Sequence, residues 1–138
     1  MTDITLVTAN KVDVVESIIQ MTLPAAEALA PGDAVRLDTS TGKFTKANGT
    51  TAAEARIYGI AVGQHAVPAG MPVTAIRKGV LTGHDLSGLA YDKAVLLSDT
   101  DGALADTAGT VSVTVGRVIP GTSSPLGSAY DKLLFVDL

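Results

Sequence analysis

The 138-residue chain contains no cysteine and no tryptophan, and only 4% of its residues are aromatic. The absence of cysteine excludes disulfide bonds and thiolate zinc sites, and it agrees with a protein made in a reducing cytosol. With so few aromatic rings, the core must be built from Val, Leu, Ile and Ala. Such a core is thin for a 14.0 kDa domain. Burial of further apolar surface against a partner would therefore stabilise the protein.

The chain also lacks a concentration of positive charge and a long apolar run. Ten Lys and Arg against fourteen Asp and Glu give a net charge of −4, and the basic residues are scattered, so nucleic acid is not an expected partner. No apolar run approaches the roughly 18 residues of a membrane-spanning helix, and none is expected. The first residues, MTDITLVTANKVD, have no basic stretch before an apolar block, which argues against a signal peptide.

What the chain does contain is a series of short runs rich in Val, Ile, Leu and Thr, separated by Gly and Pro. This pattern is typical of many short β-strands. In TVSVTVGRV, for example, Val113 and Val115 point to one face and Ser112 and Thr114 to the other. The expected strands cover residues 4–8, 16–23, 34–38, 43–47, 56–62, 73–80, 94–98, 103–106, 111–119 and 133–138.

Helix is scarce in this pattern. Val12, Val15 and Ile19 would share one face of a helix, but their β-branched side chains favour a strand. We therefore expect an all-β fold, either a jelly-roll-like antiparallel sandwich or a squat barrel of about eight to ten short strands. Residues 1–22 are expected to form an N-terminal arm and the first strands, able to extend onto a neighbour. Residues 23–138 are expected to form a single β domain.

One unit of sequence occurs twice. APGDAVRLDTSTGKFTKANGT, residues 30–50, aligns without a gap on AYDKAVLLSDTDGALADTAGT, residues 90–110. Each copy is followed by a strand with Gly inside it, IYGIAV and VTVGRVI, and SAYDKLLFVDL at the C-terminus reads as a third, shortened copy. The apolar and Gly positions match between copies while the polar positions differ. The repeat therefore indicates strand pairing rather than a reactive site.

Few residues suggest metal chemistry. Asp99, Asp101 and Asp106 resemble part of a calcium loop, because oxygen ligands alternate before a Gly. However, Thr110 stands where an EF-hand requires Glu. We expect no metal and no cofactor.

Catalytic arrangements are equally few. His65 and His84 are the two histidines, and neither has a carboxylate or a second histidine at metal-binding spacing. Both are interpreted as solvent-facing loop residues. Ser123, Ser124 and Ser128 lack the G-x-S-x-G motif of a nucleophilic serine. No catalytic residue is assigned, and the protein is not expected to be an enzyme.

The succession of strand motifs resembles that of the small capsid cement, or decoration, proteins of tailed bacteriophages. The motifs that carry the resemblance are LPAAEALAPGDAVRLD, IYGIAVGQHAVPAGMPVTAIRKGVLTG, LAYDKAVLLSDTDGALAD and VGRVI. They include a Gly-Asp-x-Val strand, a Gly-Ile-Ala strand, and an Ala-Gly-x-x-Val turn that leads into a Gly-Val-Leu strand. The resemblance covers roughly residues 23–119.

The resemblance implies a structural virion protein without enzymatic activity, made in the host cytoplasm and located on the outer surface of the capsid. It would bind the major capsid protein and clamp adjacent subunits, which stabilises the phage head. A homo-oligomer is expected, with a dimer favoured over a trimer because two-fold pairing is the commonest symmetry. Two alternatives stay open: a carbohydrate- or host-receptor-binding β module, and a small β-barrel hydrolase.

Apolar chain ends on a small domain need something to cover them. The interface with the shell is therefore expected in the N-terminal arm and in the final strand. For the final strand, an ordinary place in the core is an equal alternative. The expected contact residues are Ile4, Leu6, Val7, Leu133, Leu134, Phe135 and Leu138.

Overall fold

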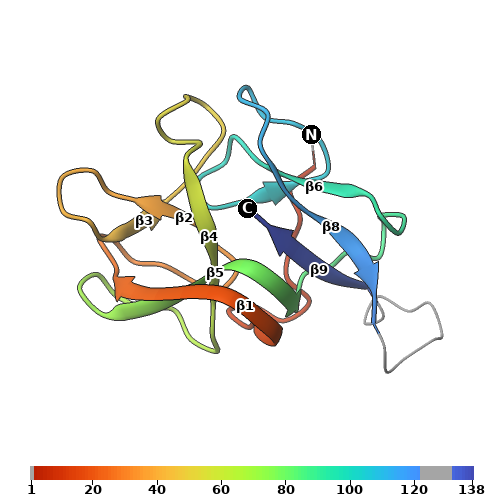
Figure 1. Cartoon of the computed structure of the whole chain (residues 1–138), viewed down its shortest axis with the longest axis horizontal. Coiled ribbons are helices and arrows are strands. Elements are labelled where there is room, and N and C mark those ends of the chain that lie inside the picture. The colour runs from red at the N-terminus through yellow and green to blue at the C-terminus, as the bar shows by residue number, and fades with distance from the viewer. Residues whose placement is uncertain (1, 122–131) are drawn as a thin grey trace.

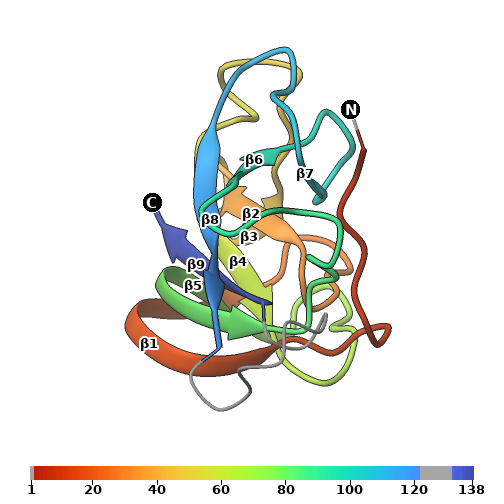
Figure 2. The same ribbon diagram turned by 90° about the vertical axis from the view of Figure 1, so that its right-hand side faces the viewer.

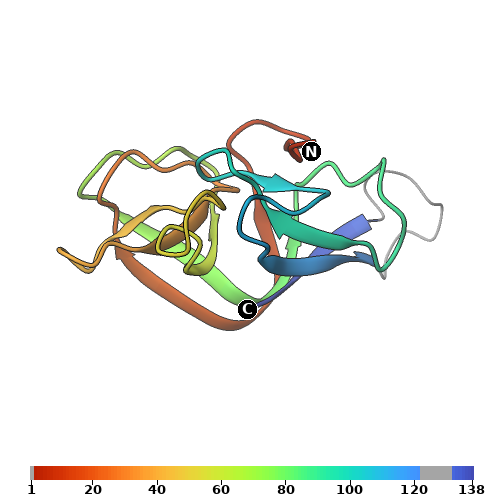
Figure 3. The same cartoon turned by 90° about the horizontal axis from the view of Figure 1, so that it is seen from above.

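A computed structural model of the chain describes residues 2–121 and 132–138. All regular structure in these residues is β-strand, and the strands pair antiparallel in one curled sheet that forms a half-barrel (Figures 1 and 3). The expected all-β, antiparallel fold is thus confirmed. The described residues contain no helix long and apolar enough to cross a membrane.

The sheet has the strand order β3-β2-β4-β5-β9-β8-β6-β7, with β1 paired to β5. The strands are β1 (Asp13–Pro24), β2 (Ala34–Leu37), β3 (Phe44–Lys46), β4 (Ile57–Val62), β5 (Pro72–Thr82), β6 (Ala94–Leu97), β7 (Leu104–Ala105), β8 (Thr114–Pro120) and β9 (Lys132–Asp137). Each corresponds to an expected strand, with bounds that differ by a few residues. The expectation of a strand over residues 4–8 is wrong. This segment makes only an isolated bridge at Leu6, because its backbone crosses from β7 to the end of β5 instead of following one strand.

Strand β5 joins the two halves of the molecule. β1 pairs with it from Asp13↔Thr82 to Pro24↔Pro72, whereas β4 and β9 pair with successive parts of it. Ile76 has partners in both β1 and β4, so these two strands lie on opposite edges of β5. Figure 3 shows the result, two lobes, with β1 and β5 running from the outer side of one lobe to the middle of the molecule.

The duplicated sequence unit is a duplicated structural unit. Val35 of β2 pairs with Gly59 of β4, and Val95 of β6 pairs with Gly116 of β8. In both pairs the register shifts at the residue that follows the valine. β5 then lies beside β4 as β9 lies beside β8. Residues 132–137 form a strand at the end of the chain, as expected, but β9 takes the place of β5 and so does not repeat the first strand of the unit. Residues 128–131 lie outside the described residues.

The glycine inside each second strand has a steric cause. A Cβ on Gly59 would lie 2.5 Å from the carbonyl oxygen of Ile76, and a Cβ on Gly116 would lie 1.9 Å from that of Phe135. Ile76 and Phe135 hold equivalent places, since they pair with the residues that follow the two glycines. Close approach of the neighbouring backbone therefore requires glycine at both positions.

The core consists mainly of Val, Leu, Ile and Ala, as the composition predicts. A larger cluster lies mostly in the lobe of β6, β8 and β9, with members such as Leu97, Val115 and Leu134. A smaller cluster in the other lobe surrounds Phe44, whose side chain is fully buried. Of the residues of β1, only Leu23 packs against either cluster.

Candidate functional site

Strand β1 has an open edge. Its sequence, DVVESIIQMTLP, is rich in β-branched residues, which favour an extended backbone. One edge pairs with β5, and in residues 2–121 and 132–138 no other segment pairs with β1. The second edge therefore presents backbone N–H and C=O groups that are available to another strand.

The other two outer strands of the sheet are covered by the chain itself. At β3, Ala25 forms a bridge to Phe44, and the N–H of Ala26 donates to the carbonyl of Phe44 at 2.7 Å. At β7, the N–H of Ile4 in the N-terminal arm donates to the carbonyl of Leu104 at 2.8 Å. Covered edges of this kind prevent unwanted strand pairing. Among the described residues, β1 is the outer strand whose second edge has no such cover.

The apolar side chains of β1 are also exposed. Of the nine large hydrophobic residues that are exposed in the described part of the chain, five lie on β1. Their exposed fractions run from 40% to 55%. A cluster of exposed apolar side chains is typical of an interaction surface. We call this surface the β1 edge; it comprises Val14, Val15, Ile18, Ile19 and Met21.

Charge on β1 is confined to its first residues, Asp13 and Glu16. Asp13 lies 3.9 Å from the Nζ of Lys11 and accepts a hydrogen bond from the side chain of Gln64. The rest of the strand carries no charged side chain. Burial of this uncharged part against a protein would require no desolvation of charge.

Register shifts bend the strand. They fall between Val14 and Glu16, between Ser17 and Ile19, and between Ile19 and the next residue. Figure 2 shows the resulting curvature of β1 along the border of the molecule. Bulges twist an edge away from a straight partner, so another strand can follow β1 most easily over its regular end, Gln20 to Pro24.

His84 marks a second place of interest, beneath the N-terminal arm. Leu6 forms a bridge to His84, and the N–H of Val7 donates to the carbonyl of Gly83 at 2.7 Å. The His84 side chain is only 4% exposed, and neither ring nitrogen has a hydrogen-bond partner among the described residues. Burial lowers the pKa of His84 to about 4. The expectation of a solvent-facing His84 is therefore wrong, because the arm covers it, whereas His65 is exposed as expected.

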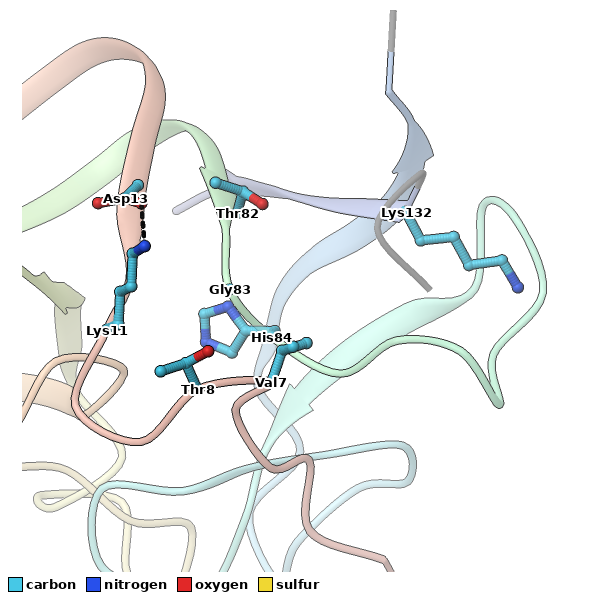
Figure 4. Close-up of a pocket in the computed structure, with 8 residues that line it drawn as sticks. All are labelled: Val7, Thr8, Lys11, Asp13, Thr82, Gly83, His84 and Lys132. Carbon is cyan, nitrogen blue, oxygen red and sulfur yellow. Dashed lines mark ion pairs between the residues drawn. The ribbon is translucent and has the colours of Figure 1, made fainter. Parts of the chain in front are cut away.

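A pocket of about 140 Å³ opens beside His84 (Figure 4). Its charged side chains already have partners. Lys11 pairs with Asp13, and Lys132 points away from the ring and donates to the carbonyl of Leu89. The imidazole is thus a buried polar group in this pocket wall without a partner among the described residues, and its low pKa leaves it uncharged at neutral pH.

The three aspartates considered for calcium bind other parts of the chain. Asp99 accepts hydrogen bonds from the backbone N–H and the hydroxyl of Thr110, both at 2.9 Å. Asp101 accepts one from the side chain of Asn48, and Asp106 accepts one at 3.1 Å from the backbone of the N-terminal arm. In the described ranges no group of three or more His, Asp or Glu is placed to hold a metal ion.

The described residues contain one close pair of aromatic rings, Phe44 and Tyr58, whose centroids lie 5.5 Å apart. Phe44 is buried, and Tyr58 is half-buried with the guanidinium carbon of Arg77 5.3 Å from its ring centroid. Tyr91 is 48% exposed, and Tyr130 lies outside the described residues. A surface of stacked exposed rings, which the carbohydrate-binding alternative needs, is not formed by this part of the chain.

The predicted contact residues of the arm lie on the chain's own domain. Ile4 and Leu6 are partly buried against the larger core cluster, and Val7 is 39% exposed. The arm thus closes the edge of β7 and covers His84 in the isolated chain. That it also contacts a shell stays a prediction.

The predicted contact residues of the final strand are mainly core residues. Leu134 is fully buried, while Leu133, Phe135 and Leu138 are partly buried. β9 pairs with β5 on one side and β8 on the other. Its contact with a shell stays a prediction as well.

Sequence reasoning missed the β1 edge. The strand itself was expected over residues 16–23, but its exposure was not. One signal was available: Val14 next to Val15, and Ile18 next to Ile19, place apolar side chains on both faces of one strand. A strand at the border of a sheet with two apolar faces has more apolar surface than its own domain can cover.

In sequence, the chain matches no protein-family model and no curated protein.

Proposed function

We propose that the protein is a structural virion component that binds the outer surface of a tailed-phage capsid and clamps adjacent copies of the major capsid protein. The observation that carries the proposal is the β1 edge, an apolar and unpaired strand on a domain whose other outer strands are covered. Burial of such a surface against protein is favourable. The resemblance of the strand motifs to capsid cement proteins agrees with this role.

A clamp needs a rigid body as well as an adhesive surface. The body here is a half-barrel with two core clusters, and the arm is fixed to it by backbone hydrogen bonds such as Ile4 N–H to Leu104 O at 2.8 Å. On a shell, the same contact is repeated at many equivalent positions. Modest local free energies then add to a large resistance against expansion of the shell.

Co-sedimentation with empty capsid shells tests the proposal. The wild-type protein should pellet with shells in a saturable manner. Val15→Lys and Ile18→Lys place a charge in the β1 edge and should weaken attachment about tenfold or more, which corresponds to about 1.4 kcal/mol. Met71→Lys is the matched control, since Met71 is 53% exposed and lies outside β1. Absence of wild-type attachment, or equal attachment of all variants, would overturn the proposal.

A further inference from the structure

We propose that a pocket between the end of β2 and the start of β4 binds the carboxylate of an acidic peptide segment. The pocket has a volume of about 720 Å³, which lies in the range of ligand sites. We call it the arginine pocket, because Arg56, in the loop before β4, and Arg77 of β5 line it. No residue of the β1 edge lines it, so the inference goes beyond the proposed function and does not rest on it.

A bulge in β5 sets the position of Arg77. It is the only residue of β5 that has no partner on β1, and a bulge of this kind re-aims the side chain of the extra residue. The guanidinium carbon of Arg77 lies 5.3 Å from the ring centroid of Tyr58, and its Nη1 donates to the carbonyl of Tyr58 at 3.3 Å. These contacts hold the guanidinium at the pocket wall, so less entropy is lost when a ligand binds to it.

Both arginines have hydrogen-bonding capacity to spare. The ion pairs among the described residues involve neither Arg56 nor Arg77. A guanidinium carries five N–H donors in a planar fork, and Arg77 uses one of its two terminal nitrogens within the described chain. Arg56 is exposed. The remaining donors match the two oxygens of a carboxylate, which an arginine binds through paired hydrogen bonds.

The charge of the pocket is opposite to that of the whole chain. Asp38 is the one carboxylate among the described residues that line it, and this side chain accepts a hydrogen bond from the backbone N–H of Ser40 at 3.0 Å. Asp38 is thus bound within the turn that follows β2, and Arg56 and Arg77 are left to an anion from outside. Two cations and one anion favour a singly charged carboxylate over a phosphate that carries two charges. The chain's net charge of −4 also disfavours a nucleic acid.

The apolar part of the pocket wall indicates what carries the carboxylate. Leu37, which is 43% exposed, and the half-buried Ile57 both line the pocket. A free inorganic anion would leave these side chains in water. A peptide segment with an apolar residue beside its acid covers them as well, and this burial adds to the affinity. The combination of two arginines and an apolar wall therefore fits an acidic peptide segment better than an isolated anion.

Titration with capped dipeptides, followed by NMR, tests the arginine pocket. Acetyl-Leu-Glu-amide should shift the signals of Tyr58 and Arg77 in a saturable manner, with a dissociation constant of the order of millimolar, as suits so small a ligand. Acetyl-Leu-Gln-amide has the same shape without the charge and should bind at least about tenfold more weakly. Acetyl-Ala-Glu-amide lacks the side chain that would cover Leu37 and Ile57, and it should bind a few-fold more weakly.

Variants of the protein assign the binding to the two arginines. Arg56→Gln and Arg77→Lys should each weaken binding of acetyl-Leu-Glu-amide about fivefold or more, the second because lysine keeps the charge but lacks the planar fork. Arg117→Gln is the matched control, since Arg117 is exposed, pairs with Asp92 at 2.9 Å and lies outside the pocket. It should bind the peptide as the wild type does. The dispersion of the amide signals in the same spectra shows whether each variant is folded.

Several results would overturn the inference. These are equal binding of the Glu and Gln peptides, no saturable shift up to about 50 mM peptide, or a loss in Arg117→Gln as large as that in Arg56→Gln. Inorganic phosphate, titrated in the same way, should bind more weakly than acetyl-Leu-Glu-amide; tighter binding of phosphate would show a site for free anions and overturn the peptide assignment. The titrations contain no shells, so their failure leaves the proposed function standing. Failure of the wild-type protein to pellet with shells leaves the arginine pocket standing.

Discussion

Gly116 has no Cβ, and this lets the backbone of β8 lie close to that of β9. Gly116→Ala would place a Cβ 1.9 Å from the carbonyl oxygen of Phe135, and backbone cannot yield as a side chain can. We expect this variant to lose at least about 3 kcal/mol in the free energy of unfolding, or to fail to fold. Gly88→Ala is the control, because a Cβ there meets nothing within 4 Å, and it should change stability by less than about 0.5 kcal/mol. Urea unfolding of both variants measures the difference, and equal stabilities would contradict the steric account.

His84 makes stability depend on pH. Burial lowers the pKa of its ring from 6.5 to about 4, so between these values the unfolded chain binds a proton that the folded chain does not. The free energy of unfolding should therefore be unaffected by this group above pH 6.5 and should fall as the pH decreases from 6.5 to about 4. The total loss should be about 3 kcal/mol.

A variant isolates this effect from the titration of the carboxylates. His84→Leu removes two ring nitrogens that have no partner among the described residues, so it should raise the free energy of unfolding by about 1 kcal/mol at pH 7. It should also lose the part of the acid sensitivity that falls between pH 6.5 and about 4. Chemical unfolding at pH 7, 5.5 and 4.5 compares it with the wild type. Parallel pH profiles for the two proteins would show that His84 is not the group that titrates.

At the scale of elements, the N-terminal arm acts as a cover. It closes the edge of β7, lies over His84, and packs Ile4 and Leu6 against the core. Deletion of residues 2–9 should leave a folded domain that is less stable by about 2 to 4 kcal/mol, from lost apolar burial and lost hydrogen bonds. Hydrogen exchange should then accelerate at the amides of Asp106 and Asp85, which donate to the carbonyls of Thr2 and Thr5 in the arm.

Deletion of residues 2–9 should also change the pKa of His84, and this provides a second test of the cover. With the arm removed, His84 becomes exposed and its pKa should return toward the ordinary value of 6.5. The acid-sensitive part of stability should shrink accordingly. Unchanged exchange at Asp85 and Asp106 and an unchanged pH profile would mean that the arm does not cover these groups in solution.

Strand positions could be predicted because each depends on neighbours in the sequence. Alternation of Val with polar residues, and Gly or Pro between runs, specified the strands and the repeated hairpin. Long-range contacts could not be predicted in this way. His84 is buried by Leu6, which is distant from it in the sequence, and β1 is exposed because of where β5 lies in the sheet. No local pattern indicates the burial of His84, and the adjacent apolar residues of β1 indicate surplus apolar surface but not the strand beside which β1 lies.

At the scale of the whole molecule, two copies of one β unit meet at β5 and β9. Lys78 and Asp137 pair across this junction, with the Nζ 3.8 Å from a carboxylate oxygen. Their side chains are 39% and 51% exposed, so the ion pair contributes at most about 1 kcal/mol. The backbone pairing and the shared core hold the lobes together. The molecule is thus a continuous half-barrel with the exposed apolar strand β1 at its border, and the proposed function rests on that strand.

Hydrogen exchange with and without empty capsid shells tests this account most directly. In dilute free protein, the backbone amides of residues 14–22 that face away from β5 should exchange fast, because nothing in the described chain covers that edge. With shells in excess, these amides should become protected at least about tenfold, while the exposed turn between β2 and β3 should be unchanged. If β1 exchanges equally fast in both conditions although the protein pellets with the shells, another surface makes the attachment and the central claim is contradicted.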